Sequence, residues 1–275
     1  MSPHFAAYSF VDRIVDFEPA KRARGTFAVP AHLPEFSSCL VAEAVGQLAA
    51  WVSMAHIDFR GRPVAALATE TRFHGDAVPG RTLDLRVDIA DCDDDAVAYS
   101  GAAYVDGARI IELVDCLGPM LPVAEFDSPD ELRARFDLLR DGGATPGRFQ
   151  GVALPAPTIV ECVPGVSVRA TLDVPESAPF FGDHFPRRAV FPATLLLDTQ
   201  IRLAQNLARE AAWARRGGLR PARVTHVKVR SFTLPGQRLE LGVDLAPLAD
   251  GVAKAALSAK VEGRNVATAR LELTT

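Results

Sequence analysis

An internal repeat constrains this fold more than any other feature of the sequence. Residues 79–89 (PGRTLDLRVDI) reappear as residues 235–245 (PGQRLELGVDL), 156 positions further along the chain of 275. Both segments begin with a Pro-Gly turn and then alternate apolar with polar residues, which is typical of a half-buried strand. The next turn repeats at the same spacing, because Asp106-Gly107 is matched by Glu262-Gly263. The chain therefore contains two similar halves.

The sequence pattern predicts the same order of strands and helix in each half. A strand-like stretch at residues 19–30 resembles one at residues 164–175, which lies 145 positions later. One long, mostly apolar helix follows in each half, over residues 38–56 and 193–213, and three or so strands come after it. This order indicates an α+β fold in which each helix packs against an antiparallel sheet.

The two halves are separated by a stretch rich in charge, glycine and proline. We place the N-terminal unit at residues 1–126, an ordered linker at 127–157 and the C-terminal unit at 158–275. Within the linker, Ser128 is a suitable N-cap and Gly142-Gly143 a suitable stop, so a short helix is predicted between them.

Composition narrows the possible partners. A net charge of -4 argues against nucleic-acid binding. The sequence has no run of 18 or more apolar residues, so no membrane span is predicted. The N-terminus lacks the pattern of a signal peptide, so we expect a cytoplasmic protein. The acidic run at residues 92–95 is interpreted as a solvated turn, and we expect no metal.

The motif that indicates chemistry spans residues 180–198 (FFGDHFPRRAVFPATLLLD). It resembles the signature of the β-hydroxyacyl-acyl carrier protein dehydratases, a hot-dog family with the pattern H-F-P-x-x-P-V-x-P-G-x-L-x-x-E/D. Two positions depart from that pattern, since Ala189 replaces a proline and Ala193 replaces a glycine. The matching residues are His184, Phe185, Pro186, Val190, Pro192, Leu195 and Asp198.

The first half resembles the same family through its helix. Residues 40–47 (LVAEAVGQ) follow the pattern L-x-x-E-A-x-x-Q, with Glu43 at the acidic position and Gln47 at the glutamine. In the second half Asp198 holds the acidic position, but Arg202 replaces the glutamine. The first half lacks about ten residues in the loop that carries the histidine, and His32 is its nearest candidate.

The resemblance implies a fused double hot-dog with one intact site. In the family, each active site takes its histidine from one unit and its acid from the other, which joins His184 to Glu43. Asp198 then faces the shortened loop of a degraded site. Asp198, Gln47 and His32 are possible auxiliary residues, and the expected substrate-binding positions are Gly182, Phe185, Pro186, Pro192 and Ala193.

The implied activity is removal of water from 3-hydroxyacyl thioesters to give 2-enoyl thioesters, in biosynthesis of the fatty-acid or polyketide type. A histidine, whose pKa lies near neutral pH, can take the C2 proton, and a carboxyl group in an apolar tunnel can protonate the departing hydroxyl. No metal or redox cofactor is implied, because the substrate is carried on the phosphopantetheine of acyl carrier protein or on CoA. The fused chain would act as a monomeric pseudo-dimer or in a higher homo-oligomer.

Other interpretations remain open from the residues alone. A hot-dog thioesterase would use a carboxylate to activate water, and a non-catalytic acyl-binding or scaffold protein would bind without turnover. Glu43 could instead form a structural ion pair with an arginine, and His184 could be a loop histidine bound to backbone.

Overall fold

The computed structural model describes residues 4–211 and 219–274. The first half contains β1 (Arg13–Glu18), β2 (Arg22–Ala28), α1 (Ser38–His56), β3 (Gly61–Pro63), β4 (Leu67–Phe73), β5 (Thr82–Cys92), β6 (Ala96–Val105) and β7 (Ala108–Pro122). The linker holds the 3-10 helix η1 (Val123–Glu125) and α2 (Pro129–Asp141). The second half contains β8 (Thr158–Val163), β9 (Ser167–Asp173), the 3-10 helix η2 (Pro179–Gly182), α3 (Ala193–Arg209), β10 (Arg220–Val229), β11 (Arg238–Leu245), β12 (Val252–Val261) and β13 (Arg264–Thr274).

The described strands form one antiparallel sheet whose pairing order is the same in both halves. The order runs β1-β2-β5-β6-β7-β4 and then β10-β13-β12-β11-β9-β8, with β3 paired to β7. Counted inward from either end, equivalent strands therefore occupy equivalent places, and β4 meets β10 at the centre. The repeated turns share a backbone conformation too, because φ is positive at Asp106 and Gly107 and again at Glu262 and Gly263. That conformation suits two-residue hairpins.

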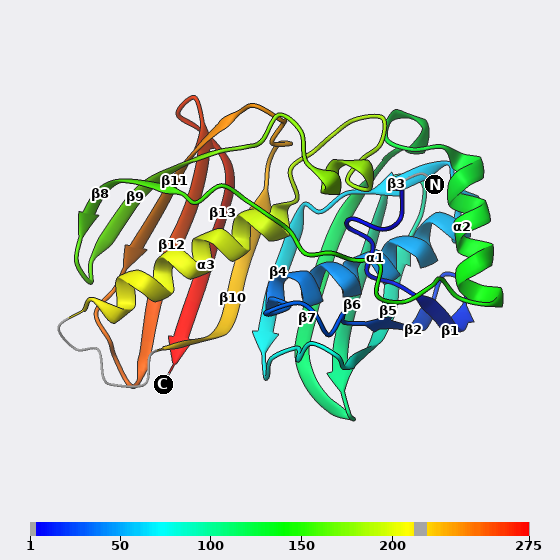
Figure 1. Ribbon diagram of the computed structural model, residues 1–275, viewed down its shortest axis with the longest axis horizontal. Coiled ribbons are helices and arrows are strands. Elements are labelled where there is room, and N and C mark those ends of the chain that lie inside the picture. The colour runs from blue at the N-terminus through cyan, green and yellow to red at the C-terminus, as the bar shows by residue number, and fades with distance from the viewer. Residues whose placement is uncertain (1–3, 212–218, 275) are drawn as a thin grey trace.

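The helices α1 and α3 lie across the same face of the sheet, each over its own half (Figure 1), and they contact each other. Helix α1 begins where the sequence predicts, because the Ser37 side chain accepts a hydrogen bond from the Leu40 N–H. Its buried face is wide, as Leu40, Val45, Leu48 and Trp51 are all buried. By length and composition alone α1 could cross a membrane, but most of it is buried inside the protein, as in the core helix of a globular protein.

Two details differ from the sequence prediction. Helix α3 ends at Arg209, where the chain approaches the β8–β9 turn at Gly165; the remainder of the predicted helix, to Trp213, reaches beyond the described residues. Four strands, rather than about three, follow α3, and the first half adds the short β3. The pairing of β4 with β10 was not predicted from the sequence, and the apolar alternation of β4 is weak, since most of this strand is exposed or half-buried.

The linker helix forms as predicted. Helix α2 begins after Ser128, whose side chain accepts from the Glu131 N–H, and ends at Asp141 with Gly142 as the cap. It packs beside β1 at one end of the sheet (Figure 1).

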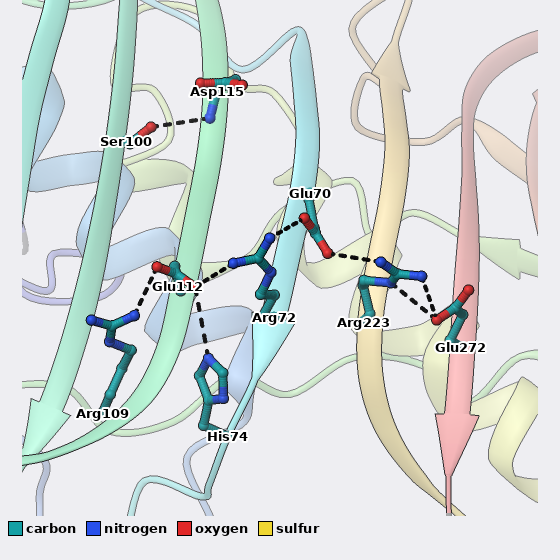
Figure 2. Close-up of polar contacts among 9 residues, drawn as sticks. All are labelled: Glu70, Arg72, His74, Ser100, Arg109, Glu112, Asp115, Arg223 and Glu272. Atoms are coloured by element: carbon teal, nitrogen blue, oxygen red, sulfur yellow. Dashed lines mark hydrogen bonds and ion pairs between the residues drawn. The ribbon is translucent and has the colours of Figure 1, made fainter. Parts of the chain in front are cut away.

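The seam between the halves carries a row of ion pairs on its solvent-facing side (Figure 2). Arg72 on β4 and Arg223 on β10 are direct cross-strand partners. Glu70 lies between them and accepts from Arg72 at 2.7 Å and from Arg223 at 3.2 Å. One carboxylate thus bridges two like charges that would otherwise repel each other across the seam.

Candidate active site

The loop before α3 holds His184 in a fixed orientation. The Val190 N–H donates to the His184 carbonyl at 3.0 Å, and the His184 Nδ1 lies 2.7 Å from the Val190 carbonyl oxygen. Because a carbonyl can only accept, Nδ1 carries the proton and Nε2 is left with a lone pair. The ring of Phe185 stacks on the His184 ring at 4.2 Å between centroids, and the Arg62 guanidinium covers Phe185.

Burial sets the protonation state of His184. Desolvation lowers the pKa of the imidazole below its ordinary value of 6.5, although the charge of Glu43 opposes this effect. A neutral ring at neutral pH can accept a proton, which is the property required of a general base.

Glu43 lies near the middle of α1 and accepts hydrogen bonds from both halves. Gln47, one turn further along α1, donates from Nε2 to Glu43 Oε1 at 3.1 Å. Thr194, in the first turn of α3, donates from Oγ1 to Glu43 Oε2 at 2.8 Å. The alternative of a structural ion pair has no support here, because no arginine is paired with Glu43 among the described ion pairs.

His184 and Glu43 line the same cavity of about 240 Å³, which lies between the two halves. Its walls are largely apolar and include Trp51 and Met54 from α1, Leu196 from α3 and Val227 from β10. The cavity therefore joins two titratable groups to an apolar chamber, an arrangement suited to a small substrate with a hydrocarbon chain.

The other predicted site residues divide into two groups. Gln47, Phe185 and Ala193 line the cavity. Five others do not line it. Pro192 is the N-cap of α3, and Pro186 and His32 are exposed. The Gly182 carbonyl accepts a hydrogen bond from His4, and Asp198 is paired with Arg202.

Four residues around the cavity were not predicted from the sequence. Tyr8 and Asp183 hold the N-terminal segment against the site, Thr194 binds Glu43, and Arg62 pairs with Asp127 at 2.9 Å. Asp183 stands directly before His184 in the motif, which is the one local signal that could have marked it. Tyr8 lies outside both repeats, so nothing near it in the sequence points to the site.

One group among the described residues could hold a metal ion. Ligand atoms of His4, Asp127 and Glu131 lie within 4.8 Å of one another. Asp127 is, however, engaged by Arg62, and His4 is bonded to the Gly182 carbonyl and near Asp183. Two of the three residues are therefore already engaged by groups of the protein itself.

Part of the chain is similar in sequence to a known family. Residues 158–270 match the FabA-like domain family. The chain is 32% identical over 122 residues to the 3-hydroxyacyl-acyl-carrier-protein dehydratase FabZ of Bordetella pertussis, a match that covers 41% of this chain and 79% of that protein.

Solved structures resemble nearly the whole chain. A MaoC-like dehydratase has a TM-score of 0.54 and 13% identity, with 93% of this chain and 98% of that one covered. The 12:0-ACP thioesterase from Umbellularia californica also has a TM-score of 0.54 and 13% identity, with 92% and 93% covered. At such identities the likeness shows the hot-dog fold alone. The FabZ match is what shows that this chain belongs to the β-hydroxyacyl-acyl carrier protein dehydratase family.

Proposed function

We propose that the chain consists of two tandem hot-dog units that share one active site. Residues 1–126 would form the unit that supplies Glu43, residues 158–275 the unit that supplies His184, and residues 127–157 the linker. The repeated pairing order of the strands supports this division. A single chain then provides what two separate hot-dog subunits would provide together.

The proposed reaction is removal of water from a 3-hydroxyacyl thioester. Nε2 of His184 takes the proton from C2, and the carboxyl group of Glu43 gives a proton to the C3 hydroxyl. The C3–O bond breaks, water leaves, and a C2–C3 double bond forms. Transfer of a proton from His184 back to Glu43 through solvent restores the starting state.

The thioester carbonyl needs a partner for the negative charge that develops on its oxygen. The first N–H groups of a helix have no acceptor within the helix, so those of Ala193 and Thr194 at the start of α3 are suited to this role. Alanine at position 193 keeps the N–H while adding a methyl group beside the cavity, and we expect it to restrict the substrates accepted.

The observation that carries this proposal is that His184 and Glu43 line one cavity although they belong to different halves. The neutral histidine and the FabZ match favour dehydration, and acyl carrier protein is the proposed carrier because the FabZ relatives are named for it.

The test is turnover of a short 3-hydroxyacyl thioester, presented on acyl carrier protein, on CoA and on a pantetheine mimic. We expect conjugated enoyl product from the wild type, and losses of about 10²- to 10⁴-fold in kcat for His184→Gln and Glu43→Gln. Release of a free thiol instead of the enoyl product would indicate a thioesterase. Binding of the substrate with neither product would indicate a scaffold protein.

A further inference from the structure

The hydroxyl of Tyr8 belongs to a chain of hydrogen bonds that ends at Glu43. It lies 2.8 Å from Thr194 Oγ1, which in turn lies 2.8 Å from Glu43 Oε2. A threonine hydroxyl has one proton, and an ionised carboxylate can only accept. When Glu43 is ionised, Thr194 therefore donates to Glu43 and Tyr8 donates to Thr194.

Tyr8 keeps its proton under all ordinary conditions. Its side chain is buried, with 1% of the residue exposed. Burial, together with the charge of Glu43, raises the pKa of the Tyr8 phenol well above its ordinary value. The hydroxyl is thus a permanent donor at the far end of the chain of hydrogen bonds.

The backbone of Tyr8 is held from both sides of the site. Its N–H donates to Asp183 Oδ2 at 2.7 Å, and Asp183 is the neighbour of His184. Its carbonyl accepts from Gln47 Nε2 at 2.9 Å, and Gln47 is the residue that also bonds to Glu43. The Phe10 N–H donates to Gln47 Oε1 at 2.8 Å, which fixes the orientation of the Gln47 amide.

Asp183 strengthens this attachment. It also accepts from the Phe5 N–H and from the Ser9 hydroxyl, the latter at 3.1 Å. Burial alone would raise the pKa of Asp183, but the hydrogen bonds from His4 and from the N–H groups of Tyr8 and Phe5 hold it below its ordinary value. An ionised carboxylate beside the histidine thus anchors the segment that brings Tyr8 to the glutamate.

We propose that Tyr8 and Thr194 are positioning residues that orient Glu43 and stabilise the charge it acquires when it gives up its proton. This inference rests on the proposed function, in which Glu43 is the acid. The chain of donors strengthens as the carboxylate forms, so its effect falls on the chemical step and leaves substrate binding largely unchanged.

The experiment compares kcat and KM for three single variants. Thr194→Val removes the hydroxyl at similar volume, and we expect kcat to fall about 10- to 100-fold, the range for a hydrogen bond to a charged group, with KM within about twofold. Thr194→Ser keeps the hydroxyl and should retain kcat within about threefold. Tyr8→Phe removes one oxygen without disturbing the fold, and a smaller loss of about three- to tenfold is expected because Thr194 still donates.

A double-mutant cycle separates positioning from a general structural effect. If Thr194 acts through Glu43, Thr194→Val should cause no further loss in a Glu43→Gln background. An equal loss in both backgrounds, or full kcat in both Thr194→Val and Tyr8→Phe, would overturn the inference.

Failure of the proposed function can be told apart from failure of this inference. If the wild type shows no turnover, the infrared difference between wild type and Glu43→Gln still isolates the carboxyl band of Glu43. A band that shifts in Thr194→Val and Tyr8→Phe and returns in Thr194→Ser supports the hydrogen-bond chain. A band that is the same in all four proteins contradicts it.

Discussion

His184 Nδ1 and the carbonyl oxygen of Val190 lie 2.7 Å apart, and the Val190 N–H returns a second hydrogen bond to the His184 carbonyl. Two residues six positions apart thus close the loop upon itself. The imidazole can neither turn over nor exchange tautomers without breaking the first of these bonds. If His184 is the base, as proposed, its fixed free nitrogen loses little entropy when the substrate binds.

In the proposed mechanism, the pH dependence of activity follows from the protonation of His184. Because burial lowers the pKa of this imidazole below 6.5, the ring stays neutral until the pH falls below that value. We expect kcat/KM for a 3-hydroxyacyl thioester to decline on the acid side with a midpoint below pH 6.5. A pH profile in overlapping buffers measures this midpoint, and a midpoint above the ordinary histidine value would contradict the assignment. The residual activity of His184→Gln, if measurable, should lack this decline.

Asp198 is expected to be dispensable for turnover. It accepts from Arg202 at 2.8 Å, Arg202 also reaches Glu35 at 2.5 Å, and Asp198 does not line the cavity. Asp198→Asn should therefore retain kcat within about twofold and change the free energy of unfolding by about 1 kcal/mol or less, as is usual for exposed ion pairs. Glu43→Gln is the matched control, since it alters the equivalent acidic position of the other half. A loss of kcat in Asp198→Asn as large as that in Glu43→Gln would contradict the pairing of His184 with Glu43 in one site.

His4 should make stability depend on pH in the alkaline range. Burial of the ring opposes protonation, but bonds to Asp127 and Asp183 outweigh it and raise the pKa of His4 to about 10. A folded-state pKa above the ordinary 6.5 means that protonated His4 stabilises the fold fully below pH 6.5, and that this contribution is lost as the pH rises toward 10. Urea unfolding across this range should show wild type more stable than His4→Gln at the acid end and equal to it at the alkaline end. A constant difference between the two proteins would count against this explanation.

The seam between the halves should respond to salt through Glu70. This carboxylate bridges Arg72 and Arg223, which face each other on β4 and β10 (Figure 2), and its pKa is lowered by the hydrogen bond from Arg72. Glu70→Gln leaves the two arginines without a shared anion, so we expect a lower melting temperature at low salt. Added salt should then stabilise Glu70→Gln relative to wild type, because it screens the repulsion between the arginines. Melting curves in low and high salt test this, and parallel shifts in both proteins would refute it.

The parts of the fold that the sequence predicted depend on local rules. The strands β5 and β11 and the hairpins that follow were visible because alternation of apolar residues and turn chemistry act over a few positions, and a second copy in register reinforced both. The predicted start of α1 was confirmed for a similar reason, since a serine cap and a wide apolar face are encoded within one segment. The pairing of β4 with β10 was missed because neither strand has a strong pattern, and each is stabilised by a strand from the other half.

A motif records which residue types stand at which spacing, so the family could be recognised from the sequence alone, and the repeat and the candidate residues His184 and Glu43 could be predicted from it. Only the tertiary structure decided that these two residues share one cavity and that Asp198 lies outside it. The same holds for Tyr8 and Thr194, whose hydrogen bond joins residues 186 positions apart. No local pattern encodes such a contact, because it forms when a terminal segment, anchored by Asp183, packs across both helices.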